Sequence, residues 1–237
     1  MIIPLYIYPF PEGPAGQAWR LVAEVAKEFP QLQIIAVVNP ANGPGETADS
    51  NYQRGIRELQ RAGVILVGYV HLEYGHRRVD LVAADLRRWS RLYPRVQGVF
   101  MDEVPDGGAM SGPNEAFVYL EEMRNLSTAR APVIGNTGVA APMGYYGTSG
   151  FDIVVAHEER YWPSPGQRPP PMVAARAAAL VYGDGVWQEE RFRRNVRRYG
   201  YLFVNDHQLD VTAAGEYPWN YLPTNLRRQA ELLSGLP

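Results

Sequence analysis

Two short stretches of the chain place acidic side chains directly after an apolar run. Residues 99–103 read VFMDE and residues 156–161 read AHEERY. An acid at the end of a buried strand lies in surroundings of low polarity, which penalise ionisation and can tune its pKa for proton transfer. A pair of such acids, Asp102 and Glu158, suits the cleavage of glycosidic bonds, with one acid as nucleophile and the other as general acid/base.

The alternation of side chains along a strand predicts which way the two acids point. If Asp102 shares a face with Gly98 and Phe100, Glu158 is expected to share its face with Val154 and Ala156. Both acids can then point toward one opening of a barrel. Their placement is compatible with the ~5–5.5 Å that separates the carboxyl groups of a retaining glycosidase.

A plainer interpretation of each acid stays open. An acid after a strand is often a helix cap or a solvated loop charge. Glu158 also stands beside Glu159 and Arg160, which is a common composition for an exposed surface.

Amide and aromatic side chains follow the other apolar runs. Rings can stack on sugar faces and amides can bind hydroxyl groups, so these residues are candidates for substrate binding. The candidates are Tyr6, Tyr8, Asn39, Tyr69, His71, Tyr74, Asn136, His157, Tyr161 and Asp206, and the same strand ends and loops also carry Tyr182, Asn205 and Trp162.

Other chemistries lack the residues that they need. The chain has no cysteine, which excludes thiolate nucleophiles and thiolate metal sites. Its one lysine, Lys27, belongs to a predicted surface helix, so no Schiff-base lysine is available. The spacing of His71, His76 and His157 matches no metal motif, and we expect them to be hydrogen-bonding wall residues. We therefore expect no metal and no organic cofactor.

Apolar runs and helical spacing alternate along the whole chain. The strands are predicted at 2–8, 34–38, 64–70, 96–101, 133–135, 152–156, 178–181 and 201–204. Helices are predicted over 19–29, near 52–59, over 81–93, from Pro113 onward, over 192–199 and over 226–233. Residues 157–177, which include SPGQRPPP, are expected to form a long ordered loop.

Eight strands that are apolar on both faces, separated by helices, predict a parallel sheet closed into a (β/α)8 TIM barrel. The chain is close to the ~250 residues typical of that fold, and we expect one domain over residues 1–237. An open, doubly wound sheet is the alternative. It would need a glycine-rich phosphate turn after the first strand, where the chain reads YPFPEGPAG.

Charge and hydropathy limit the partners. The net charge is −2, so no basic field is available to hold nucleic acid, and no apolar run has the ~20 residues of a membrane span. We expect a monomer that binds a polysaccharide or oligosaccharide. No signal-peptide pattern is visible at the N-terminus, so both a cytoplasmic location and a secreted or cell-surface one, after removal of a leader, stay open.

Several segments together resemble the spherulin-4 family (spherulation-specific family 4), which is similar to glycoside hydrolase family 135. They are IPLYIYP at 3–9, VVNPANGPG at 37–45, GYVHLEYGHR at 68–77, GVFMDE at 98–103, HEERY at 157–161, and GYLFVND at 200–206 with the later LPTN. They occur in order and cover essentially the whole chain.

The resemblance implies a (β/α)8 barrel. It also implies the retaining endo-α-1,4-N-acetylgalactosaminidase activity of the characterised fungal branch, which acts on galactosaminogalactan. The family's acids fall on Asp102, Glu103 and Glu158, so Asp102 is the implied nucleophile, Glu158 the implied general acid/base, and Glu103 an orienting residue. His157 stands where an aromatic residue is expected. A non-catalytic carbohydrate-binding or cell-surface barrel is the alternative.

Overall fold

The strands form one eight-stranded parallel sheet in sequence order, from β1 to β8. The computed structural model describes residues 1–105, 113–126, 132–146, 150–207 and 217–235. The strands are β1 (Ile2–Leu5), β2 (Ile35–Val38), β3 (Ile65–His71), β4 (Gly98–Asp102), β5 (Val133–Asn136), β6 (Ile153–Glu159), β7 (Ala177–Tyr182) and β8 (Tyr201–Asn205). Residues of β1 also approach β8, so the sheet curves round into a barrel. The fold is a (β/α)8 TIM barrel.

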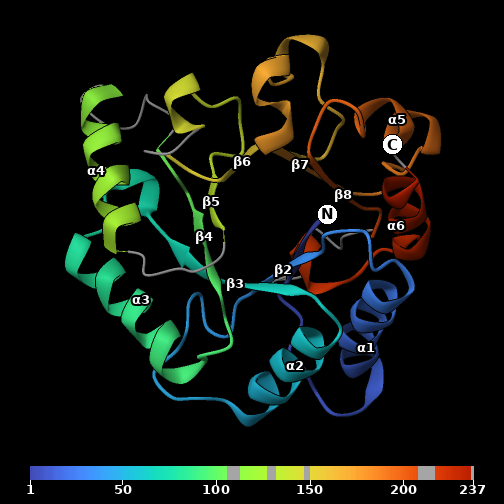
Figure 1. Ribbon diagram of the computed structural model, residues 1–237, viewed down its shortest axis with the longest axis horizontal. Helices are drawn as coiled ribbons and strands as arrows, with labels where there is room; N and C mark the ends of the chain where they lie inside the picture. Colours follow the sequence, from blue (N-terminus) through green and yellow to red (C-terminus); the bar gives the residue numbers. More distant parts are fainter. Residues whose placement is uncertain (106–112, 127–131, 147–149, 208–216, 236–237) are drawn as a thin grey trace.

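In the described parts of the chain, six α-helices surround the strands (Figure 1). They are α1 (Gly13–Glu28), α2 (Ser50–Arg61), α3 (Val79–Leu92), α4 (Pro113–Leu126), α5 (Glu189–Asn195) and α6 (Leu226–Ser234). In the described parts of the β5–β6 and β6–β7 connections, short 3-10 helices stand in place of an α-helix: η2 (Met143–Tyr145), η3 (Pro165–Gln167) and η4 (Pro171–Arg176). None of the described helices has both the length and the apolar content to cross a membrane.

Close packing between helix and strand depends on two glycines of the sheet. A Cβ atom on Gly68 of β3 would lie 2.4 Å from the Trp89 ring of α3, and one on Gly135 of β5 would lie 2.5 Å from the Phe151 ring. The missing side chain therefore lets a large ring lie directly on the strand. The Trp89 indole also donates to the Tyr69 carbonyl at 3.0 Å, which fixes α3 against β3 beside the mouth of the barrel.

Hydrogen bonds join the first and last strands at their amino-terminal ends, on the side of the barrel away from the mouth. The hydroxyl of Tyr201, at the start of β8, donates to Gln33 Oε1 at 2.8 Å, and the amino group of Met1 donates to the Gln33 carbonyl at 2.8 Å. On the outside of β8, the Gln229 side chain of α6 accepts from the Val204 N–H at 2.9 Å and donates to the Val204 carbonyl. These bonds hold the last strand in place.

All eight predicted strands and all six predicted helices are confirmed, with shifted ends. The first strand is shorter than predicted, because the chain leaves the sheet after Leu5. The sixth strand is longer and runs to Glu159, so the connection to β7 begins three residues later than the predicted loop at 157. The rest of that connection contains only the 3-10 helices η3 and η4.

Candidate active site

Three polar side chains meet inside the mouth of the barrel, at the carboxyl ends of neighbouring strands. Asp102 ends β4, Asn136 ends β5, and Glu158 lies one residue before the end of β6. The amide nitrogen of Asn136 donates to Asp102 Oδ1 at 2.7 Å and to Glu158 Oε2 at 2.5 Å. One amide group therefore holds the two carboxyl groups on either side of it.

The Asn136 amide is oriented by its oxygen. Asn136 Oδ1 accepts the backbone N–H of Gly138 at 2.9 Å, which leaves both N–H groups of the amide to face the acids. The residue is buried, so the arrangement is held by packing as well as by hydrogen bonds. The sum of the two amide–carboxyl distances is an upper limit for the separation of the two carboxyl oxygens. These two oxygens are therefore no farther apart than the ~5–5.5 Å of a retaining pair, and closer than the ~6.5–9.5 Å of an inverting pair.

A β-bulge turns Glu158 into the barrel. Val155 lies beside Asn136 on the inner face of the sheet and pairs with Ala178 of β7. The next pair is His157 with Ala179, so Ala156 is one extra residue in β6. A bulge of this kind reverses the alternation of side chains beyond it. The prediction that Glu158 shares a face with Val154 and Ala156 is wrong, because the extra residue returns Glu158 to the face of Val155.

The same bulge turns His157 away from the mouth. Its partner Ala179 belongs to the apolar cluster that lies between β7, β8 and the outer helices. His157 is 2% exposed, its Nε2 lies 2.7 Å from the Tyr161 carbonyl oxygen, and burial lowers its pKa. The structure therefore corrects its expected place in a sugar site: His157 supports the loop that follows β6, and its ring meets the Tyr161 ring edge to face.

A tryptophan that sequence reasoning missed also contacts Glu158. Trp219 donates its indole N–H to Glu158 Oε1 at 2.9 Å, and its ring packs edge to face against Tyr182 at the end of β7. It lies in the 3-10 helix η5 (Pro218–Asn220), far from both acids in sequence. The usable signal was a tryptophan in the connection that follows the last strand, on the side where the mouth of a barrel is built.

The turn that carries Trp219 is clamped from two strands. Asn205, fully buried at the end of β8, donates to the Pro218 carbonyl at 2.5 Å and to the Tyr221 carbonyl at 2.9 Å. The backbone N–H of Tyr6 donates to the Trp219 carbonyl at 3.2 Å. Trp219 is thus held over Glu158 by hydrogen bonds to its own backbone and to its neighbours.

The surroundings of Glu158 give its carboxyl group a higher pKa than that of an ordinary glutamate. Withdrawal from water raises the pKa of Glu158 to about 7, and the charge of nearby Asp102 acts in the same direction. The hydrogen bonds from Asn136 and Trp219 favour the ionised form and partly offset that rise. Glu158 can therefore hold a proton near neutral pH.

Two tyrosines lie beside the acids. Tyr69 donates its hydroxyl to Asp102 Oδ2 at 2.8 Å, and its ring meets the Tyr6 ring edge to face at 5.6 Å. Burial raises the pKa of both tyrosines, and the charge of Asp102 raises it further. Both are neutral hydroxyl groups at ordinary pH, which can hydrogen-bond a substrate without adding charge.

His71 and Tyr74 lie at the rim next to Tyr69. The His71 ring stacks on the Tyr69 ring at 6.4 Å, and its Nε2 lies 3.5 Å from Glu73 Oε1. Tyr74 is 53% exposed and has a φ of 54°, a left-handed conformation that is uncommon for a tyrosine. The structure brings both residues to the edge of the site, where His71 is the strand partner of Asp102.

Glu103 follows Asp102 but does not join the Asn136 group. Its φ is 53°, and its carbonyl accepts the Tyr74 N–H at 2.8 Å. Within the described residues its carboxylate makes no hydrogen bond, yet its charge contributes to raising the pKa of Tyr69. Glu103 is therefore close to the site, with backbone strain stored at the step that follows Asp102.

The remaining candidates lie outside the acid pair. Tyr8 donates to Asp49, the N-cap of α2, and Asn39 accepts the Gly43 N–H within its own loop. Asp206 accepts a hydrogen bond from Asn225.

Trp162 lies inside the outer apolar cluster, where its indole donates to the Val186 carbonyl. The expectation that Trp162 stacks on a sugar is corrected, because the ring is buried against β7 and the outer helix layer. Tyr161 is half exposed on the loop after β6.

The fold and the site define a (β/α)8 barrel with two carboxyl groups joined across its mouth. The family model of spherulation-specific family 4 matches residues 1–230, so the chain belongs to that family. A curated relative, Spherulin-4 of Physarum polycephalum, is 36% identical over 152 residues, which are 63% of this chain. The matched region is 42% of that relative, so the chain spans less than half of its length.

Three solved structures share the fold. Sph3 of Aspergillus clavatus, solved in complex with GalNAc, has a TM-score of 0.77 and 22% identity, over 99% of this chain and 97% of that one. An α-L-fucosidase of Bacteroides thetaiotaomicron has a TM-score of 0.53 and 11% identity, over 97% and 60%. A chitinase of Rhizomucor miehei has a TM-score of 0.53 and 11% identity, over 98% of each chain. These similarities show the barrel.

Proposed function

We propose that this protein is a retaining glycoside hydrolase whose reacting carboxyl groups are Asp102 and Glu158. The observation that carries the proposal is the Asn136 amide, which bonds both carboxyl groups and keeps the two bonded oxygens no farther apart than in a retaining pair. The raised pKa of Glu158 supports the assignment of roles, because the general acid must hold a proton.

The mechanism assigns one task to each acid. Glu158 donates its proton to the glycosidic oxygen while the bond to the anomeric carbon breaks, and the Asp102 carboxylate forms a new bond to that carbon. Glu158 then takes a proton from water, the hydroxide oxygen bonds to the anomeric carbon, and Asp102 leaves as a carboxylate. Water is consumed, and two inversions leave the configuration retained.

The residues around the acids assist these steps. Asn136 and Tyr69 hold Asp102 through both of its oxygens, so the attacking group is oriented before substrate arrives. Trp219 fixes the second oxygen of Glu158. We assign Glu103 two supporting roles. Its negative charge helps keep the Tyr69 hydroxyl protonated, and its left-handed backbone sets the course of the chain directly after Asp102.

The substrate that we propose is a polysaccharide containing α-1,4-linked N-acetylgalactosamine, of the galactosaminogalactan type, cleaved within the chain. Membership of spherulation-specific family 4 and the fold shared with Sph3, solved with GalNAc, support this choice. Tyr6, Tyr69 and Tyr74 supply neutral hydroxyl groups and rings around the acids, which suit an uncharged sugar.

The test is hydrolysis of galactosaminogalactan and related glycans by the purified protein, with the product anomer followed by NMR. Asp102→Asn and Glu158→Gln should each lower kcat by at least about a hundredfold, because each removes a covalent or proton-transfer step. Glu159→Gln is the matched control: its strand partner is Val181, a residue of the outer cluster, so it should keep nearly full activity.

Two outcomes would contradict the proposal. Full activity in Asp102→Asn or Glu158→Gln would refute the assignment of roles. Glycan binding without any release of product would favour the alternative, a non-catalytic carbohydrate-binding barrel.

A further inference from the structure

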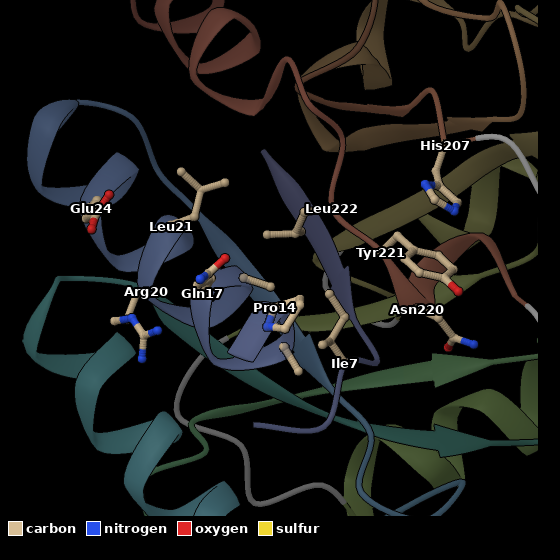
Figure 2. A pocket seen from close by; sticks show the side chains of 12 residues that line it. Ile7, Pro14, Gln17, Arg20, Leu21, Glu24, His207, Asn220, Tyr221 and Leu222 are labelled. Atoms are coloured by element: carbon tan, nitrogen blue, oxygen red, sulfur yellow. The ribbon is translucent and has the colours of Figure 1, made fainter. Parts of the chain in front are cut away.

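A groove lies on the outer side of the turn that carries Trp219. It encloses about 660 Å³ between helix α1, the residues after β1 and the residues after β8 (Figure 2). We call it the α1 groove. Its apolar lining includes Ile7, Leu21 and Leu222, and its polar lining includes Gln17 and Asn220. The volume is typical of a ligand site, and the lining combines apolar side chains with polar and charged ones.

One wall of the α1 groove presents an aromatic platform. The rings of Tyr221 and His207 stack at 3.8 Å with an angle of 18° between their planes, and Tyr221 is 39% exposed. Figure 2 shows both rings on the same side of the groove, opposite α1. Stacking limits the freedom of the Tyr221 ring, so little conformational entropy is lost when a ligand packs on it.

The groove and the acid pair share one turn of the chain. Trp219 contacts Glu158, and Tyr221, two residues later, lines the groove. The Cα atoms of these residues can be no more than ~7 Å apart, because two residues of extended chain reach no farther. Asn205 clamps both sides of the turn through the carbonyls of Pro218 and Tyr221. The groove and the acid pair are therefore neighbours that lie on either side of this turn.

The other end of the groove is bounded by charge. Glu24 of α1 lines it and pairs with Arg227 of α6 at 2.7 Å, and the same arginine bonds Glu28. The ion pairs join the two helices where the groove runs down their flank.

We infer that the α1 groove binds further sugar units of the polysaccharide whose cleaved unit lies at Asp102 and Glu158. The inference rests on the proposed function and extends it. A second binding region outside the mouth of the barrel would favour long polysaccharide chains as substrates over short oligosaccharides. The Trp219–Leu222 turn selects this occupant, because it borders both the acid pair and the groove and so places the groove within reach of a polymer bound at the acids.

The experiment measures binding separately from cleavage. In a Glu158→Gln background, titration calorimetry follows N-acetylgalactosamine and a long α-1,4-linked oligomer of it. Tyr221→Ala should weaken binding of the long oligomer about tenfold, as expected for loss of an aromatic anchor, and leave the monosaccharide unchanged. Tyr221→Phe keeps the ring and should keep the affinity. Tyr217→Ala removes an exposed tyrosine that precedes the same turn outside the groove lining, and should change neither.

The outcomes separate the groove from the catalytic proposal. Unchanged oligomer binding in Tyr221→Ala, or equal loss for monosaccharide and oligomer, overturns the groove; hydrolysis by the unmodified protein would then still support the catalytic proposal. Oligomer binding that depends on Tyr221, in a protein that hydrolyses nothing, keeps the groove and rejects the catalysis. Absence of both binding and hydrolysis rejects both.

Discussion

The proton on Glu158 is the feature of the site with the widest consequences. Burial and the Asp102 charge oppose its ionisation, while Asn136 and Trp219 each donate a hydrogen bond that favours it. The pKa that results, about 7, is a balance of these influences and of the nearby charge of Glu159, which also raises it. Removing any one of the partners should move it in a known direction.

The pH dependence of cleavage tests that balance. We expect kcat/KM to fall as the pH rises through about 7, because Glu158 loses the proton that it must donate. Trp219→Phe removes a donor that stabilises the ionised form, so the descending limb should move to higher pH. A pH–rate profile of both proteins is the measurement. A limb that stays in place, or moves to lower pH, would reject the role of Trp219.

The same pKa predicts a pH-dependent stability. The folded-state pKa of Glu158 lies above the ordinary 4.5, so between these values the unfolded chain has released a proton that the folded chain keeps. Glu158 therefore lowers the free energy of unfolding as the pH rises from about 4.5 to about 7, by a few kcal/mol at most.

Glu158→Gln removes this titration. Urea unfolding at pH 5 and pH 8 should show the variant gaining stability relative to the unmodified protein at the higher pH. Glu159→Gln serves as the control, because Glu159 contributes only a small Coulombic influence on Glu158. An identical stability difference at both pH values would contradict the raised pKa.

Much of the site could be predicted at the level of residue type. Strand ends rich in acids, amides and tyrosines pointed to Asp102, Asn136, Glu158 and Tyr69, which the structure brings together. Trp219 could not be placed, because its contact with Glu158 depends on the path of a loop fixed by Asn205.

At the scale of the element, β6 shows why the faces of the strands were harder to predict than their positions. Apolar runs located all eight strands, since a strand buried on both faces needs little else. A bulge is a single extra residue, and neither Ala156 nor His157 is a residue type from which a bulge could be predicted in a single sequence. The alternation rule therefore predicted correctly that Glu158 points into the mouth of the barrel, but it assigned the wrong residues of β6, Val154 and Ala156, to the same face.

The contact of β3 with α3 allows a sharp test of packing. Gly68→Ala would place a methyl group 2.4 Å from the Trp89 ring, so helix or strand must shift. We expect a loss of ~1–3 kcal/mol in the free energy of unfolding, as for other overpacked cores. Gly166→Ala is the matched control, because a Cβ there meets no atom within 4 Å. Equal stability of the two variants in denaturant titrations would show that the contact adapts.

At the scale of the whole molecule, the apolar core runs through all described parts of the chain. The larger cluster contains residues from Met1 to Ala230, and the smaller one, beside β7 and β8, shares Tyr146 and Leu233 with it as packing neighbours. We propose that residues 1–237 form one domain, because no boundary separates these clusters.

A single cooperative transition in scanning calorimetry, with equal calorimetric and van't Hoff enthalpies, is the expected result. Glu24→Gln, which weakens one exposed ion pair between α1 and α6, should leave that single transition in place. Two separable transitions in the unmodified protein would reject the single domain.

The clamp that Asn205 places on the Trp219 turn has a consequence for the protein during its own synthesis. The acids and the amide that joins them emerge from the ribosome before the strand that anchors the Trp219 turn and before the indole that steadies Glu158. A nascent or truncated chain lacking that last segment would carry both acids without the partner that steadies the proton donor. The carboxyl group of Glu158 is therefore steadied only after β8 and the Trp219 turn have been synthesised and have docked.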